Sequence, residues 1–170
     1  MHRLSLMFLV SAAFVLALCD TAAAQQVRRA ERLVGANENP PVVTDASGNF
    51  RAEIFPDQIA FRLRYGELEG NVTQAHLHVG NPGINGDIVV FLCANDPIVP
   101  PAPAPECPVS GVLEDVIEPD DVLEDPGGVL EAGDLEGLTR LIRQGAVYAN
   151  VHSNLHPGGE VRGQMSPRIR

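Results

Sequence analysis

Residues 58–68, which read Gln-Ile-Ala-Phe-Arg-Leu-Arg-Tyr-Gly-Glu-Leu, alternate between apolar side chains and small or charged ones. The apolar side chains occupy every second position, namely Ile59, Phe61, Leu63 and Tyr65. In an extended chain, side chains two positions apart point to the same face. This alternation is therefore typical of a half-buried β-strand.

Further segments with strand character lie on both sides of this stretch. They are separated by turn-forming pairs such as Pro82-Gly83 and Asn85-Gly86. The expected strands cover residues 28–34, 49–55, 72–79, 88–93, 146–153 and 160–166. Residues 88–93 are apolar on both faces, which predicts a central strand of the sheet.

One segment has helical spacing instead. Apolar residues recur three or four positions apart at Leu135, Leu138, Leu141 and Ile142. Asp134 can cap the start of this helix, and Gly145 can end it. Short strands joined by turns, with a single helix, predict an all-β fold: an antiparallel β-sandwich or flattened barrel with one short helix.

The first 24 residues have the pattern of a secretion signal. A short basic start is followed by an apolar run over residues 4–18 and by Ala22-Ala23-Ala24, which suits cleavage. The run is shorter than the roughly 20 apolar residues of a membrane span. We expect residues 1–24 to be a signal peptide and residues 25–170 to be one domain of an exported protein, periplasmic or secreted. Retention as an uncleaved anchor is the alternative.

The charge of the chain limits its partners. The formal net charge is −10 at pH 7, and all 12 basic residues are arginines. An acidic surface disfavours nucleic acids and anionic membranes. We expect no nucleic-acid partner and no membrane span after signal cleavage. An extracytoplasmic protein or a small ligand, of unknown identity, remains as the partner.

Removal of the signal leaves two cysteines, Cys93 and Cys107. In an exported protein these are expected to form a disulfide. The enclosed segment holds five prolines, so it predicts a stapled surface loop. The residues that follow are acidic and lack a base up to Gly133. We expect a Pro-rich and acidic insertion over about residues 94–132, mobile or loosely packed, with one edge strand.

Three stretches resemble a known family. They are residues 33–42, residues 75–90 and residues 147–164, the last with a Tyr-x-Asn-x-His strand followed by Gly-Glu-x-Arg-Gly-Gln. In this order they resemble the CHRD domain of chordin and of exported microbial proteins. The resemblance implies a fold and export, and it suggests a binding role, since chordin is a secreted antagonist of growth factors. It implies neither an activity nor a particular ligand.

The histidines of these stretches could bind a metal. His76 and His78 lie two positions apart on one expected strand, so their side chains share a face. His152 ends another strand, and His156 follows in a turn. The two motifs occur together in domains of the family that the chain resembles, so we expect them to lie close in space. A His-x-His strand with one or two more imidazoles forms a suitable set for copper or zinc. The metal hypothesis therefore names His76, His78, His152 and His156.

The same residues also fit a purely structural network. Alternation along the last two strands predicts one polar face, carrying Tyr148, Asn150, His152, Glu160, Arg162 and Gln164. His76 and His78 can join this face, with Arg162 held by Glu160 or by backbone carbonyls. A hydrogen-bonded network of this kind fixes strand register and needs no metal.

Three functional hypotheses follow. The first is an exported, non-enzymatic binding or structural module of unknown ligand, which requires no cofactor. The second is a copper- or zinc-binding protein that uses the histidines, and the third is a metal-dependent oxidoreductase. The sequence has no Gly-x-Ser-x-Gly elbow and no phosphate-binding glycine loop, so we predict no catalytic residues.

Overall fold

A computed structural model describes residues 26–30, 32–95, 97–109 and 111–165. The expected signal peptide over residues 1–24 lies outside these described residues. Within them, none of the helices has the length and apolar character that crossing a membrane requires.

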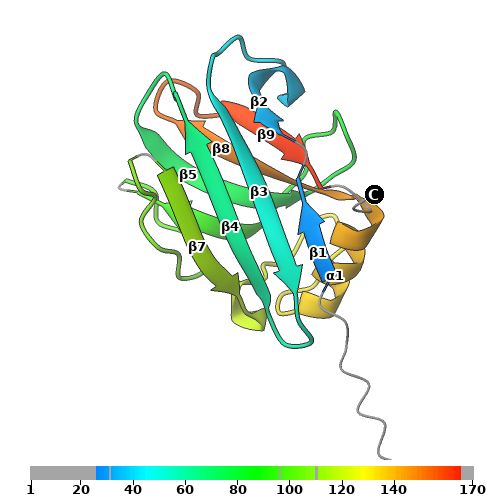
Figure 1. The fold of residues 1–170 in the computed structure, drawn as a ribbon. Helices are drawn as coiled ribbons and strands as arrows, with labels where there is room; N and C mark the ends of the chain where they lie inside the picture. Colours follow the sequence, from blue (N-terminus) through cyan, green and yellow to red (C-terminus); the bar gives the residue numbers. More distant parts are fainter. Residues whose placement is uncertain (1–25, 31, 96, 110, 166–170) are drawn as a thin grey trace, which may run out of the picture.

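The described chain is built of strands with one α-helix (Figure 1). The strands are β1 (Gln26–Arg29), β2 (Leu33–Val34), β3 (Ser47–Ile54), β4 (Ile59–Gly66), β5 (Val72–Val79), β6 (Ile88–Ala94), β7 (Gly111–Ile117), β8 (Val147–Ser153) and β9 (Val161–Gln164). The helix α1 spans Leu135–Gln144, and two short 3₁₀ turns cover Gly35–Asn37 and Pro119–Asp121.

All the strand pairs are antiparallel, in the order β6-β5-β8-β9-β2-β3-β4-β7, with β1 added beside β3. In Figure 1, β3, β4 and β7 lie in front of β5 and β8. The two-residue strand β2 joins the halves, because Val34 pairs with Arg162 of β9 and Leu33 pairs with Gly48 of β3. The predicted all-β sandwich or flattened barrel is confirmed.

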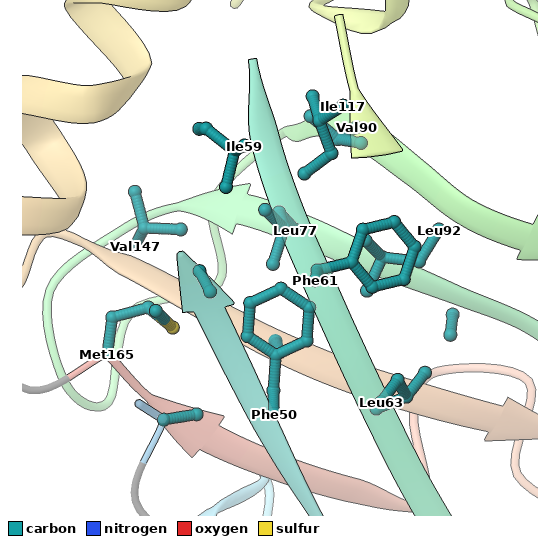
Figure 2. Close-up of a cluster of buried hydrophobic side chains, with 14 of the residues drawn as sticks. Phe50, Ile59, Phe61, Leu63, Leu77, Val90, Leu92, Ile117, Val147 and Met165 are labelled. Carbon is teal, nitrogen blue, oxygen red and sulfur yellow. The ribbon is translucent and has the colours of Figure 1, made fainter. Parts of the chain in front are cut away.

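The apolar core lies between the two halves. The alternating face of β4 is buried as predicted, and Phe50 of β3 and Phe61 of β4 stack with ring centroids 5.7 Å apart. Figure 2 shows these rings beside Leu77 and Leu92 from the other half. Burying a side chain of this size contributes about 1.5–3 kcal/mol, so this layer holds the two halves together.

The helix α1 forms where its spacing predicts. The Asp134 side chain accepts a hydrogen bond from the backbone N–H of Gly137, and Gly145 ends the helix in a left-handed conformation with φ 77°. Its apolar face packs on the core, where Leu138 and Ile142 have no exposed surface. Asp134, Gly145 and the apolar spacing therefore play their predicted roles.

The prediction that residues 88–93 form a central strand is wrong. The strand β6 stands at one end of the sheet order, although Val89, Leu92 and Cys93 are buried. Loops cover its outer edge: Ala94 N–H donates to the Pro105 carbonyl, and Leu123 N–H donates to the Val89 carbonyl. These bonds satisfy backbone groups at an edge that would otherwise be exposed, which is one way in which proteins protect edge strands.

The insertion over about residues 94–132 holds the predicted edge strand, β7, at the other end of the sheet order. Its packing is tighter than expected, since Ile117, Val122 and Leu130 belong to the buried core. Most acidic residues of this segment are exposed, but Asp125 is buried and its side chain accepts from the Val129 N–H. Apolar residues are sparse in this segment, so the sequence pattern did not reveal that it contributes to the core.

The predicted disulfide between Cys93 and Cys107 is present, with a sequence separation of 14. Asn95 supports the same loop, because its side chain donates to the Cys107 carbonyl and accepts from the Cys107 N–H. The staple thus fixes the loop that covers the edge of β6.

We predict that the Cys93→Ala/Cys107→Ala variant loses about 3 kcal/mol of unfolding free energy, since closing a loop of this length restricts the unfolded chain by about that amount. Urea unfolding of the variant and of the oxidised wild type measures the loss. The reduced wild type serves as a control and should match the variant. Equal stability of the oxidised and reduced proteins would contradict a stabilising role for this staple.

Candidate functional site

The outer face of β5, β8 and β9 carries the polar residues that the sequence groups together. In the register, His76 pairs with Asn150, and Asn150 pairs with Arg162. The alternate residues, such as Leu77 and Ala149, point into the core and are fully buried. The polar face is buried as well, because every residue of β8 is buried. Its side chains must therefore find partners within the protein.

Three histidines converge on this face. His76, His78 and His152 are 0, 7 and 6 % exposed, and one ring nitrogen from each lies within 4.8 Å of the other two. The closest approach is 3.2 Å, between His76 Nδ1 and His152 Nε2. The structure thus brings together three of the four histidines named by the metal hypothesis. We refer to them below as the histidine cluster.

Two backbone carbonyls determine the tautomers of His78 and His152. His78 Nδ1 lies 2.9 Å from the Gly86 carbonyl oxygen, and His152 Nδ1 lies 3.0 Å from the Pro157 carbonyl oxygen. A carbonyl oxygen can only accept, so each Nδ1 carries the proton and donates it. In the neutral ring, each Nε2 then has a free lone pair directed into the cluster.

His76 is the third member, and its tautomer depends on its neighbours. Its Nε2 lies 3.0 Å from Gln74 Oε1, so with this amide orientation Nε2–H donates and Nδ1 keeps a lone pair. His78 differs, because its Nε2 carries no proton. In the same amide orientation this nitrogen faces Asn150 Oδ1 at 3.1 Å, so two acceptors face each other. Three nitrogen lone pairs then converge. Rotating both amides by a half-turn, with Nδ1 of His76 protonated, gives a closed hydrogen-bond network instead.

The cluster is held neutral by burial. Desolvation, followed by the proximity of His152 and His78, lowers the pKa of His76 to about 2. Desolvation lowers the pKa of His152 to about 4, against the opposing hydrogen bond to Pro157. It also lowers the pKa of His78. The three rings are therefore neutral at neutral pH, as histidine ligands of a metal must be.

Arg162 and Tyr148 hold the loop that supplies the Gly86 carbonyl. The Arg162 guanidinium lies 3.3 Å from the centroid of the Tyr148 ring, and that ring stacks on His78 at 4.7 Å. Arg162 also donates to the Ile84 carbonyl at 2.8 Å, while Gly86 N–H donates to Tyr148 Oη at 3.2 Å. Of the two partners considered for Arg162, backbone carbonyls rather than Glu160 bind it.

Gln164 completes this support. Its side-chain amide donates to the carbonyls of Gly80, Gly145 and Val147. It therefore ties the start of the loop over residues 80–87 to the end of α1. Gly86 has to be glycine, because a Cβ there would lie 1.5 Å from the Val79 carbonyl oxygen.

The remaining two predicted residues lie elsewhere. His156 is outside the histidine cluster, and its Nε2 is 2.7 Å from Glu69 Oε2. Glu160 is fully buried near His156, and its Oε1 accepts from Thr44 Oγ1. The residues that the sequence analysis assigned to one polar face thus belong to two separate groups, the one around the histidine cluster and the one with His156 and Glu160.

Sequence reasoning missed Glu38, which lines a hollow of about 620 Å³ together with Arg162 and Gln164. Burial raises the pKa of Glu38 to about 7, against the opposing charge of Arg162. Gln74 was also missed, although its position two residues before His76 places it on the same face of the strand. No comparable pattern marks Glu38 or Glu69.

We predict that the unfolding free energy falls as the pH drops below the ordinary histidine pKa of 6.5. In that range the histidines of the unfolded chain bind protons, whereas those of the folded cluster stay neutral. Replacing His76 with Gln should flatten this slope by about 1.4 kcal/mol per pH unit. Denaturant unfolding between pH 7 and 5, with a chelator present, measures both proteins. The raised pKa of Glu38 makes its own contribution to stability grow as the pH falls. This contribution is the same in the wild type and in the variant, so it cancels in the difference between their slopes. Identical slopes would contradict a neutral, buried His76.

Residues 30–165 match the sequence model of the CHRD domain, which spans most of the 170-residue chain. No curated protein and no solved structure matches the chain. The match covers all three stretches that carry the resemblance, together with the histidine cluster and its supporting loop. This chain therefore belongs to the CHRD domain family.

Proposed function

We propose that this protein is a non-enzymatic CHRD module that acts outside the cytoplasm and binds one copper or zinc ion through His76, His78 and His152. The observation that carries the proposal is the pair of carbonyl contacts that leaves Nε2 of His78 and of His152 unprotonated in a cluster where one ring nitrogen of each histidine lies within 4.8 Å of the others. A buried set of converging acceptors is unfavourable unless something binds to it.

The donor set fits these metals. Neutral imidazoles are good ligands for zinc and copper, and zinc–nitrogen distances are about 2.0–2.1 Å. Nitrogens within 4.8 Å of one another can reach such distances with small side-chain adjustments. A metal-bound histidine commonly donates a hydrogen bond from its second ring N–H to a carbonyl oxygen. His78 and His152 make this hydrogen bond here. His76 has an amide oxygen, that of Gln74, in the same role.

A hollow lies beside His78. This residue lines a hollow of about 600 Å³ together with Asp87 and Glu124. The two carboxylates in this lining would attract a cation to the side of the cluster where His78 lies.

Burial favours binding over catalysis. A catalytic metal keeps an open position for water or substrate. None of the three histidines is more than 7 % exposed. This enclosure argues against the oxidoreductase hypothesis, and it supports a module that holds its ion. Membership of the CHRD family points to a non-enzymatic module as well.

Action outside the cytoplasm is supported by the disulfide between Cys93 and Cys107. Structural disulfides form and persist mainly in oxidising compartments. The apolar run over residues 4–18 and the alanines at 22–24 have the pattern of a cleavable signal, which agrees with export to the periplasm or beyond.

The competing account is the structural network, in which His76 donates to His152 and both amides are rotated. The two accounts differ in what the cluster does when metal is supplied. Calorimetric titration of the purified, disulfide-bonded protein with Zn²⁺ and with Cu²⁺ separates them.

We expect one ion per chain with a Kd below about 1 μM, and we expect the His76→Ala/His78→Ala variant to lose this binding. The His156→Ala variant is the matched control and should retain it. Thermal unfolding without metal checks that each variant folds, and the milder His76→Gln variant repeats the test. Absence of binding to the wild type, or binding that survives in both cluster variants, would overturn the proposal and leave the histidines as a structural network.

A further inference from the structure

A second group of potential ligands lies apart from the histidine cluster. Glu69 is in the connection between β4 and β5, His156 is in the turn after β8, and Glu160 comes just before β9. One ligand atom from each of the three lies within 4.8 Å of the other two. His156 Nε2 and Glu69 Oε2 are already in contact at 2.7 Å. The donors are two carboxylates and one imidazole.

Glu160 is the unusual member, because it is a fully buried carboxylate. Its Oε1 accepts from Thr44 Oγ1 at 3.0 Å and from the Glu69 N–H at 2.8 Å. Its Oε2 is buried and has no hydrogen-bond partner among the residues that the structure describes. No arginine forms an ion pair with it in that part of the chain either. A buried carboxylate without a counter-charge is strongly unfavourable.

The chain is shaped to hold this arrangement. His156 N–H donates to the Ser153 carbonyl, and Gly159 N–H donates to the His156 carbonyl, which closes a tight turn. Gly159 has a φ of 117°, and a Cβ there would lie 2.6 Å from Glu38 Oε1. Only glycine suits this position, so the turn brings His156 back beside Glu160.

The group is open on one side. The side chains of His156 and Glu69 are 23 and 45 % exposed, whereas Glu160 forms the buried floor. A small cation can therefore approach from solvent on the side of Glu69 and His156, with the Glu160 carboxylate at the base.

We propose that Glu69, His156 and Glu160 form a site for a divalent cation that accepts oxygen ligands together with an imidazole, such as Mn²⁺ or Zn²⁺. The ion would supply the positive charge that Glu160 lacks, and it would replace the direct contact between His156 and Glu69. Carboxylates favour harder cations such as Mn²⁺, while one imidazole also suits Zn²⁺. The site does not depend on the histidine cluster, whose donors are nitrogens alone.

Mn²⁺ is the probe, because it is the weakest of the first-row divalent ions at nitrogen donors and is well matched to carboxylates. The purified full chain is titrated with Mn²⁺, and free ion is counted from its electron paramagnetic resonance signal. We expect the wild type to bind Mn²⁺ and the Glu160→Gln variant to bind it at least about tenfold more weakly, because losing even a partner that only supports a ligand typically costs about 10- to 100-fold in metal affinity.

The Glu69→Gln variant should show the same loss, and because the Glu69 side chain is 45 % exposed this change disturbs the fold less than Glu160→Gln does. The Glu114→Gln variant, which removes an exposed carboxylate on β7, is the matched control and should bind like the wild type. The His76→Ala/His78→Ala variant should also retain Mn²⁺, which separates this site from the histidine cluster. Thermal unfolding in chelator checks the fold of Glu160→Gln. The site is refuted if the wild type does not bind Mn²⁺, or if Glu69→Gln and Glu160→Gln both bind it as well as Glu114→Gln does.

Discussion

The antiparallel register of β5, β8 and β9 sends alternate side chains to opposite sides of one layer, and both sides are buried. On the inner side, Leu77 and Ala149 join the apolar core. On the outer side, His76, Asn150 and Arg162 lie on neighbouring strands. Slipping the register by one residue would exchange the two sets and place imidazoles in the core. The apolar core therefore fixes the polar face, and the polar face cannot be rearranged without losing the core.

Burial on the outer side has chemical consequences. Water cannot satisfy the polar groups there, so each depends on a partner that the fold supplies. The Gly86 and Pro157 carbonyls accept hydrogen bonds from Nδ1–H of His78 and of His152. Arg162 is held by loop carbonyls and the Tyr148 ring. What remains unpartnered is therefore informative. Among the residues that the structure describes, single buried oxygens of Glu38, Glu160 and Gln164 lack a hydrogen-bond partner.

Much of this could be predicted from the sequence, because local patterns determine it. The alternation over residues 58–68, the cap at Asp134 and the staple between Cys93 and Cys107 each depend on residues close in the chain. The position of β6 could not be predicted, since its apolar outer edge is covered by loops that contact it at Pro105 and Leu123. The division of the histidines also escaped prediction. Glu69, which contacts His156 outside the cluster, is distant in sequence and belongs to no motif.

The central claim is that three imidazole lone pairs converge, and imidazole nitrogen NMR of the zinc-titrated protein tests it most directly. With one equivalent of Zn²⁺, the account predicts coordination through Nδ1 of His76 and through Nε2 of His78 and His152. Nδ1 of His78 and of His152 should keep its proton and its hydrogen bond to the carbonyl oxygen. Nitrogen spectra that do not change with Zn²⁺, or a proton on His76 Nδ1 in the zinc-titrated protein, would contradict it.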